Sequence, residues 1–95
     1  MFAQNKPMTH STSDIAYQLY NGFLNSDITN FDTLGLEENV YDCDVIIRYN
    51  SDNDDYGCDV FYIKLHDDQE NIIYEYTKKE CARIEKELSA YLNAD

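Results

Sequence analysis

The feature that most constrains this chain is a regular alternation of side chains between residues 40 and 49, which read VYDCDVIIRY. One set of alternate residues is apolar or aromatic: Tyr41, Cys43, Val45, Ile47 and Tyr49. The other set is mostly charged: Asp42, Asp44, Ile46 and Arg48. Because successive side chains of a strand point to opposite faces of a sheet, this pattern predicts a half-buried strand. We therefore expect a sheet with one packed face and one face in water.

Two further strands are expected after this one. The segment NSDNDDYG at residues 50–57 is rich in turn-forming residues, and a second strand is predicted over about 57–65. Its alternation places Phe61, Ile63 and Leu65 on one face and Val60, Tyr62 and Lys64 on the other. After a second turn, HDDQEN, a third strand is predicted over about 72–76. Short turns between the strands imply an antiparallel meander.

Helices are expected on both sides of the strands. Ser13 is the predicted N-cap of a helix over about 14–25, with Asp14 in its first turn. Its apolar residues recur at helical spacing: Ile15, Ala16, Leu19, Phe23 and Leu24. Thr77 and Glu80 form the capping-box pattern T-x-x-E before a second helix over about 78–93. Its apolar stripe consists of Cys81, Ile84, Leu88, Tyr91 and Leu92.

The segment between the first helix and the first strand, residues 26–39, is open to two interpretations. Its apolar residues, Ile28, Phe31, Leu34 and Leu36, suit either a loop pinned to the core or a short helix that Gly35 would end. The fold class expected from the whole pattern is α+β, in the order α-β-β-β-α, with a three-stranded antiparallel meander and two helices on one face. Residues 1–12 are expected to be a mobile polar arm, and 13–95 a single domain.

The composition narrows the class of protein. No apolar stretch near the N-terminus resembles a signal peptide, and none approaches the roughly 20 residues that cross a bilayer. The three cysteines, Cys43, Cys58 and Cys81, are an odd number without a C-x-x-C spacing, which is typical of reduced, buried thiols. We expect a soluble, intracellular protein.

The charge is unusually large and unevenly distributed. The chain has a formal net charge of −12. Residues 27–75 contain 14 of the 19 acidic residues and 2 of the 7 basic ones, so that the segments on either side are neutral. Such a surface repels nucleic acid and anionic membranes, which argues against direct binding to either. We expect a cationic partner, and the alternative is a solvated acidic face.

Metal and catalytic sites have little support in the sequence. Asp52, Asp54 and Gly57 match the first, third and sixth positions of an EF-hand loop, but the fifth and twelfth positions are Tyr56 and Ile63. The bidentate carboxylate is therefore missing, and weak cation binding is the remaining expectation. Neither His10 nor His66 lies in a recognisable catalytic spacing, and there is no phosphate-binding glycine loop. We expect no enzyme activity, no cofactor and no dedicated metal.

Tyrosines are interspersed with the acidic strands, and tyrosine is enriched in protein interfaces. Tyr41, Tyr49, Tyr74 and Tyr76 also suit the core or its border, which leaves Tyr56 and Tyr62 as the better interface candidates.

Small size, negative charge concentrated in the sheet and interspersed tyrosines resemble the anti-CRISPR and anti-restriction proteins of phages and plasmids, several of which mimic DNA. This resemblance is one of composition and element order, over about residues 14–93. It implies that carboxylates replace phosphates in the basic cleft of a nuclease or CRISPR effector, in the cytoplasm of a bacterial host cell. The residues it implicates are Asp42, Asp44, Asp52, Asp54, Asp55, Tyr56, Asp59, Tyr62, Asp67, Asp68, Glu70 and Glu75, with Glu37 and Glu38 as secondary candidates.

Two other hypotheses remain open at this point. The same electrostatics suit an immunity protein or antitoxin that neutralises one basic toxin, such as a nuclease. A cation-binding or scaffolding protein without a dedicated target is the third. In the first two cases the partner is a basic protein or ribonucleoprotein complex, and an exposed strand edge leaves the oligomeric state open.

Overall fold

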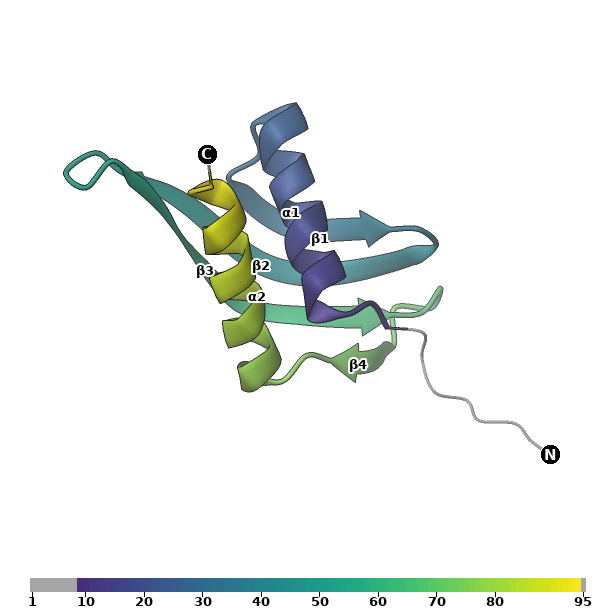
Figure 1. The fold of residues 1–95 in the computed structure, drawn as a ribbon. Coiled ribbons are helices and arrows are strands. Elements are labelled where there is room, and N and C mark those ends of the chain that lie inside the picture. Colours follow the sequence, from purple (N-terminus) through teal and green to yellow (C-terminus); the bar gives the residue numbers. More distant parts are fainter. Residues whose placement is uncertain (1–8, 95) are drawn as a thin grey trace.

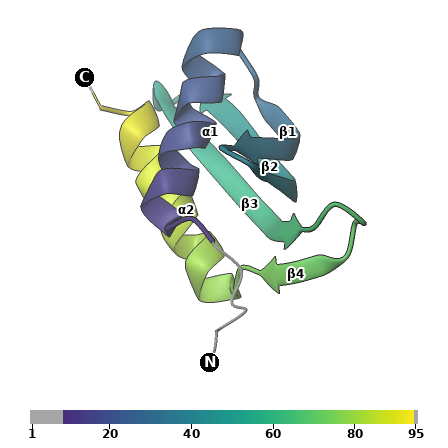
Figure 2. The same ribbon diagram turned by 90° about the vertical axis from the view of Figure 1, so that its right-hand side faces the viewer.

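The computed structural model describes residues 9–94. It contains two helices and four strands, which follow one another as α1 (Thr12–Ser26), β1 (Asn30–Leu36), β2 (Asn39–Asn50), β3 (Asp55–His66), β4 (Ile72–Glu75) and α2 (Lys78–Leu92). The strands form one antiparallel sheet in the order β1-β2-β3-β4. Both helices cover the same face of this sheet (Figures 1 and 2). The α+β class and the position of the helices are therefore confirmed.

The expectation of three strands is wrong, because residues 30–36 form a fourth strand instead of a loop or short helix. The buried residues of β1 are Phe31 and Leu34, which are three residues apart as in a helix. This spacing arises because Phe31 pairs with Val45 and Thr33 with Asp42, so that two residues of β2 lie opposite one of β1. The alternation of β1 therefore changes phase in mid-strand, and the period-two signal is lost.

A second irregularity changes the face of several side chains in β3. Asp44 pairs with Tyr62 and Val45 pairs with Val60, so that Phe61 is an additional residue, and it is 59% exposed. The prediction that Phe61 shares the buried face of Ile63 and Leu65 is therefore wrong. One extra residue moves every preceding side chain of the strand to the opposite face. Val60 consequently faces the helices and is buried.

The helices begin at capping residues, as expected from the sequence. For α2 the prediction is confirmed, since Thr77 and Glu80 form a complete capping box. For α1 the predicted cap is displaced, because Ser11 and not Ser13 accepts the hydrogen bond from the Asp14 N–H. The Ser13 hydroxyl instead donates to Glu87 of α2 at 2.7 Å. It thereby links the two helices.

The hydrophobic core lies between the helices and the sheet. Its fully buried side chains come from both helices and from the two central strands, and they include Ile15, Leu19, Tyr41, Val45, Ile63, Ile84 and Leu88. Gly22 allows α1 to approach β1 closely, since a Cβ atom there would lie 2.9 Å from the Phe31 ring. Neither helix of residues 9–94 is long and apolar enough to cross a membrane.

Most of the expected polar arm, residues 1–8, lies outside the described residues, and its mobility stays a prediction. The described end of the arm contacts the domain. His10 hydrogen-bonds to the side chains of Tyr41 and Glu37, and its carbonyl accepts a hydrogen bond from the Tyr76 hydroxyl at 2.6 Å. Thr12 already belongs to α1.

Candidate protein-interaction surface

The sheet face opposite the helices, here called the open face, carries part of the predicted acidic set. The register places Asp42 opposite Lys64 and Asp44 opposite Tyr62, while Lys64 also lies opposite Glu75 of β4. Directly opposed side chains of antiparallel strands have Cβ atoms about 4.5–5.5 Å apart. Asp42, Asp44, Tyr62 and Glu75 are therefore brought together on adjacent strands.

The pKa of the Tyr62 hydroxyl reflects the negative potential of this face. The negative charge of Asp42 raises the pKa of the Tyr62 hydroxyl, and partial burial and the charge of Asp44 add to this effect. Asp32 of β1 contributes in the same direction. Lys64 places its Nζ atom 4.7 Å from the centre of the Tyr62 ring, in a cation–π contact. The tyrosine is thus at the centre of the acidic part of the open face.

Asp59 is also on the open face, but it already has a cationic partner. Its Oδ2 atom lies 2.7 Å from Nη2 of Arg48. Arg48 is the cation that the sequence places beside the acidic loop, so that this ion pair reduces the charge available at that position. Asp59 therefore contributes less negative potential than a carboxylate without an ion pair.

The second part of the predicted set lies at the tip of the β2–β3 hairpin. Asp52 and Asp54 are in the turn and Asp55 begins β3. Asp54 adopts a left-handed backbone conformation with φ of 54° and accepts a hydrogen bond from the Tyr49 hydroxyl, which raises the Tyr49 pKa. The Asp52 N–H donates to the side chain of Asn50 at 3.0 Å. These contacts organise a turn, and within residues 9–94 no group of metal-ligating side chains is arranged to hold a cation.

Tyr56, a predicted interface residue at the same tip, lies on the side of the sheet that faces the helices. Its ring packs edge-on against Phe23 of α1, with ring centres 5.3 Å apart, and it is half-buried against the core. The extra residue Phe61 explains this position, because it puts Tyr56 and Tyr62 on opposite faces of β3. The two tyrosines therefore do not belong to one surface.

The third part lies at the other end of β3, in the turn that contains Asp67, Asp68 and Glu70. The Asp67 carboxylate accepts hydrogen bonds from the N–H groups of Gln69 and Asn71, each at 2.9 Å. These bonds, led by that from Asn71, lower the Asp67 pKa. The Asp67 carboxylate therefore stabilises the turn, whereas no such hydrogen bond engages the Asp68 carboxylate within the described residues. The eleven residue steps between Asp55 and His66 separate this turn from the hairpin tip by about 36 Å.

The structure thus divides the predicted acidic residues among the open face, the hairpin tip and the turn after β3. It also adds one acidic residue that the sequence did not indicate. Asp32 was not singled out, because residues 30–36 were not recognised as a strand. Its effect on Tyr62 places it near the acidic part of the open face. A signal for it existed in the apolar residues Phe31 and Leu34 on either side, but their helical spacing concealed the strand.

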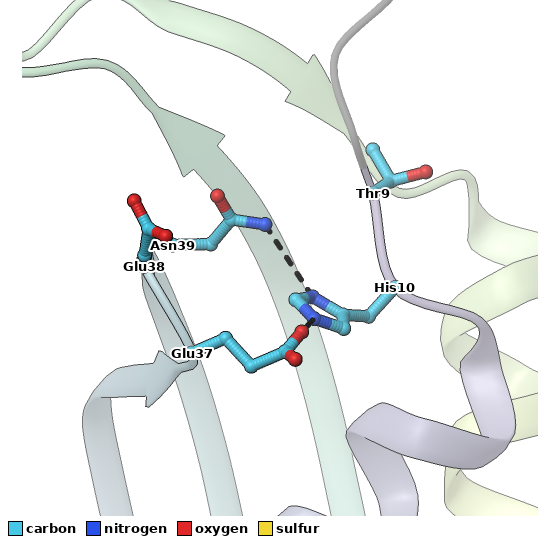
Figure 3. Close-up of a pocket in the computed structure, with 5 residues that line it drawn as sticks. All are labelled: Thr9, His10, Glu37, Glu38 and Asn39. Carbon is cyan, nitrogen blue, oxygen red and sulfur yellow. Dashed lines mark hydrogen bonds and ion pairs between the residues drawn. The ribbon is translucent and has the colours of Figure 1, made fainter.

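The secondary candidates Glu37 and Glu38 lie in the β1–β2 turn, beside a half-open pocket that also includes Thr9, His10 and Asn39 (Figure 3). His10 Nε2 is 2.7 Å from Glu37 Oε1, and His10 Nδ1 is 2.8 Å from the Tyr41 hydroxyl. The hydrogen-bonded series Glu37, His10 and Tyr41 resembles a proton relay. However, Tyr41 is completely buried, so that its hydroxyl cannot reach a substrate. The arrangement satisfies a buried hydroxyl and anchors the chain before α1.

The cysteines are separate from these places. Cys43 and Cys81 are buried and Cys58 is half-buried, and all three are free thiols. Burial raises the pKa of the Cys43 thiol to about 12 and that of the Cys58 thiol to about 11. Both are therefore neutral at physiological pH, as expected of thiols that pack as small apolar groups.

Comparisons with known proteins do not add a family to this description. No protein-family model matches the chain, and neither a curated protein nor a solved structure is significantly similar to it.

Proposed function

We propose that this protein is an acidic inhibitor that binds the basic nucleic-acid-binding surface of another protein and thereby blocks access of DNA. The observation that carries the proposal is the open face, where Asp44 lies directly opposite Tyr62 and the charges of Asp42, Asp44 and Asp32 all raise the Tyr62 pKa. A lysine or arginine that normally contacts phosphate would find a carboxylate at a comparable position. The partner class, a CRISPR effector or another bacterial defence nuclease, follows from the resemblance in size and charge.

The uneven distribution of charge supports a role in recognition. Like charges on one face of a strand lie about 6.5–7 Å apart and lower stability through repulsion. A chain that needs acidity for solubility alone can distribute it over both layers. Here α2 contains four basic and three acidic residues, while residues 27–75 carry the whole net negative charge. A basic partner would relieve this repulsion and would be attracted from a distance.

Three double variants with matched loss of charge test this proposal. Asp42→Asn with Asp44→Asn changes the open face, Asp52→Asn with Asp55→Asn the hairpin tip, and Asp68→Asn with Glu70→Gln the far turn. Each removes two negative charges, so that a general effect of net charge would be equal in all three. DNA binding by a panel of purified CRISPR effector complexes and nucleases is measured with and without each variant.

We expect the unmodified protein to displace DNA from a member of the panel, and the open-face variant to weaken this effect most. Equal weakening by all three variants would indicate unspecific attraction and would contradict a defined surface. No displacement from any member would contradict the inhibitor function. Neutralisation of one basic toxin encoded by the adjacent gene would instead assign the antitoxin function.

A further inference from the structure

The two edges of the sheet differ in how far their outward backbone groups are already hydrogen-bonded. On the β3 side, β4 pairs with residues 64–66, and α2 engages backbone groups farther along the strand. Glu85 Oε2 accepts the Val60 N–H at 2.8 Å. The side chain of Asn93 accepts the Tyr56 N–H at 2.8 Å and donates to the Tyr56 carbonyl at 2.9 Å. These helix side chains take the place of a neighbouring strand, so that β3 offers little backbone to another chain.

Among the described residues, none gives β1 comparable protection on its outer side. Within residues 9–94, no side chain or loop hydrogen-bonds to the outward backbone groups of this strand. Natural proteins commonly protect edge strands with lysine, proline, a bulge or a very short length. β1 contains neither lysine nor proline and has seven residues, compared with four in β4. The extra residue at its irregular pairing belongs to β2. β1 is therefore the longer free edge of the sheet.

The pairing with β2 identifies one backbone group that points outward. The Ile47 N–H donates to the Thr29 carbonyl at 2.7 Å, so that Thr29 faces β2. In an antiparallel strand the N–H and C=O of one residue point to the same side and alternate from residue to residue. The N–H and C=O of Asn30 therefore point away from the sheet. Asn30 is exposed and is the first residue of β1.

The charge near this edge restricts what can pair with it. Residues 27–47 contain six acidic residues and no lysine or arginine. A second copy of this chain would bring no cation to this edge, because β1 contains Asp32 and neither lysine nor arginine, and like charges are unfavourable across paired strands. A strand with lysine or arginine at alternate positions would instead place its cations beside Asp32 of β1, with Asp42 and Asp44 one strand further in. Edge pairing and the acidic open face therefore favour the same kind of partner.

We propose that the basic partner adds one of its own strands to the outer edge of β1. This inference rests on the proposed function and specifies how the partner is held: main-chain hydrogen bonds give affinity and alternate cationic side chains give specificity. The inhibitor would then extend its four-stranded sheet by a strand that belongs to the nucleic-acid-binding protein.

The test uses the full chain and a nine-residue peptide in which arginine alternates with valine. The control peptide has the same sequence but methylated backbone nitrogens at alternate residues, so that its charge is kept and one hydrogen-bonding edge is lost. Binding and amide exchange are followed by ¹H–¹⁵N spectra. We expect the unmodified peptide to shift and protect the Asn30 amide, and the methylated peptide not to do so.

Two variants at Asn30 distinguish the backbone from the side chain. Asn30→Pro removes the outward N–H, and proline is tolerated at the first residue of an edge strand. We expect it to weaken peptide binding about tenfold, as for a lost hydrogen bond. Asn30→Ala keeps the N–H and should leave the affinity nearly unchanged. Equal melting temperatures would show that both variants fold.

Each other outcome contradicts a defined part of the inference. Salt-sensitive binding that is unaffected by Asn30→Pro and shifts only the amides of Asp42, Asp44 and Tyr62 would exclude edge pairing, while the acidic-surface function would stand. If neither peptide shows salt-sensitive binding, both proposals are contradicted. Protection of the Asn30 amide that depends on protein concentration without any peptide would identify the occupant as a second copy.

Discussion

The two faces of β2 are built from alternate residues of one strand, yet they differ in almost every property. Toward the helices, Tyr41, Cys43, Val45 and Ile47 are at most 4% exposed. Toward solvent, Asp42 and Asp44 concentrate negative charge around Tyr62. The difference indicates that folding depends on one face, whereas the proposed recognition would use the other. Substitutions on the two faces should therefore affect separate measurements.

The largest effect is expected from Ile63→Ala, because Ile63 is fully buried beneath the helices. The change removes most of a buried apolar side chain and leaves a cavity, which together should lower the free energy of unfolding by about 2–5 kcal/mol. Urea unfolding followed by circular dichroism measures this change. A loss below that of an exposed substitution such as Phe61→Ala would contradict the assignment of faces in β3.

The next effect is expected from Tyr41→Phe. This change removes the hydroxyl that contacts His10 Nδ1 at 2.8 Å and accepts the His10 N–H at 3.3 Å. His10 Nδ1 keeps a longer contact with Asn39 Nδ2 at 3.4 Å, whereas the His10 N–H loses its acceptor, and the change should cost about 1–3 kcal/mol of stability. The matched change on the open face, Tyr62→Phe, should leave unfolding nearly unchanged. Equal losses in the two variants would remove the distinction between the faces.

A third prediction concerns the cap of α2. Thr77→Ala removes the acceptor for the Glu80 N–H and should cost about 0.5–2 kcal/mol of stability. Hydrogen bonds from the Thr77 N–H and the Tyr74 hydroxyl lower the pKa of Glu80, with the Thr77 bond as the larger cause. A lowered pKa adds stability above the ordinary value of 4.5, and this contribution is lost as the pH falls below it.

Thermal unfolding of the wild type and of Glu80→Gln between pH 3 and 7, in roughly one-unit steps, tests the sign. The wild type should lose its advantage over the variant as the pH falls. An advantage that grows toward acid would contradict the proposed hydrogen bonds to the carboxylate.

The smallest effect on stability is expected from Asp42→Asn combined with Asp44→Asn. Removing like charges from one face should change the free energy of unfolding by no more than about 0.5 kcal/mol, with stabilisation as the expected direction. At about 1 M salt the Debye length is near 3 Å, and the gain should disappear. A marked loss of stability would show that the open face contributes to folding and would weaken the comparison.

The sequence was sufficient for those elements whose apolar pattern is regular. Both helices, the central strand β2 and the turn residues followed from periodicity and capping signals. β1 did not, because Phe31 and Leu34 are spaced as in a helix and the change of phase depends on pairing with β2. Such an irregularity is a property of two strands together, and a single segment does not encode it.

The candidate surface shows the same limit. Asp42 and Asp44 share a face, as the alternation predicts, and pairing with β3 adds Tyr62 to that face. Tyr56 was not, because Phe61 is an additional residue between it and Tyr62. The hydrogen bonds that engage Asp54 and Asp67 within their turns likewise depend on local backbone geometry. Composition does not show such contacts, and from composition Asp54 and Asp67 were expected to be available to a partner.

The contacts of Glu85 and Asn93 with β3 have a consequence for assembly. A polymer of strands grows only if each unit can accept one neighbour and offer a place to the next. In this chain the β3 side is occupied by its own helix, and β4 has just four residues for a further partner. A strand that joins β1 would therefore end a sheet and not continue it. We therefore expect the fold to accept one added strand at its exposed edge without growing into a fibre.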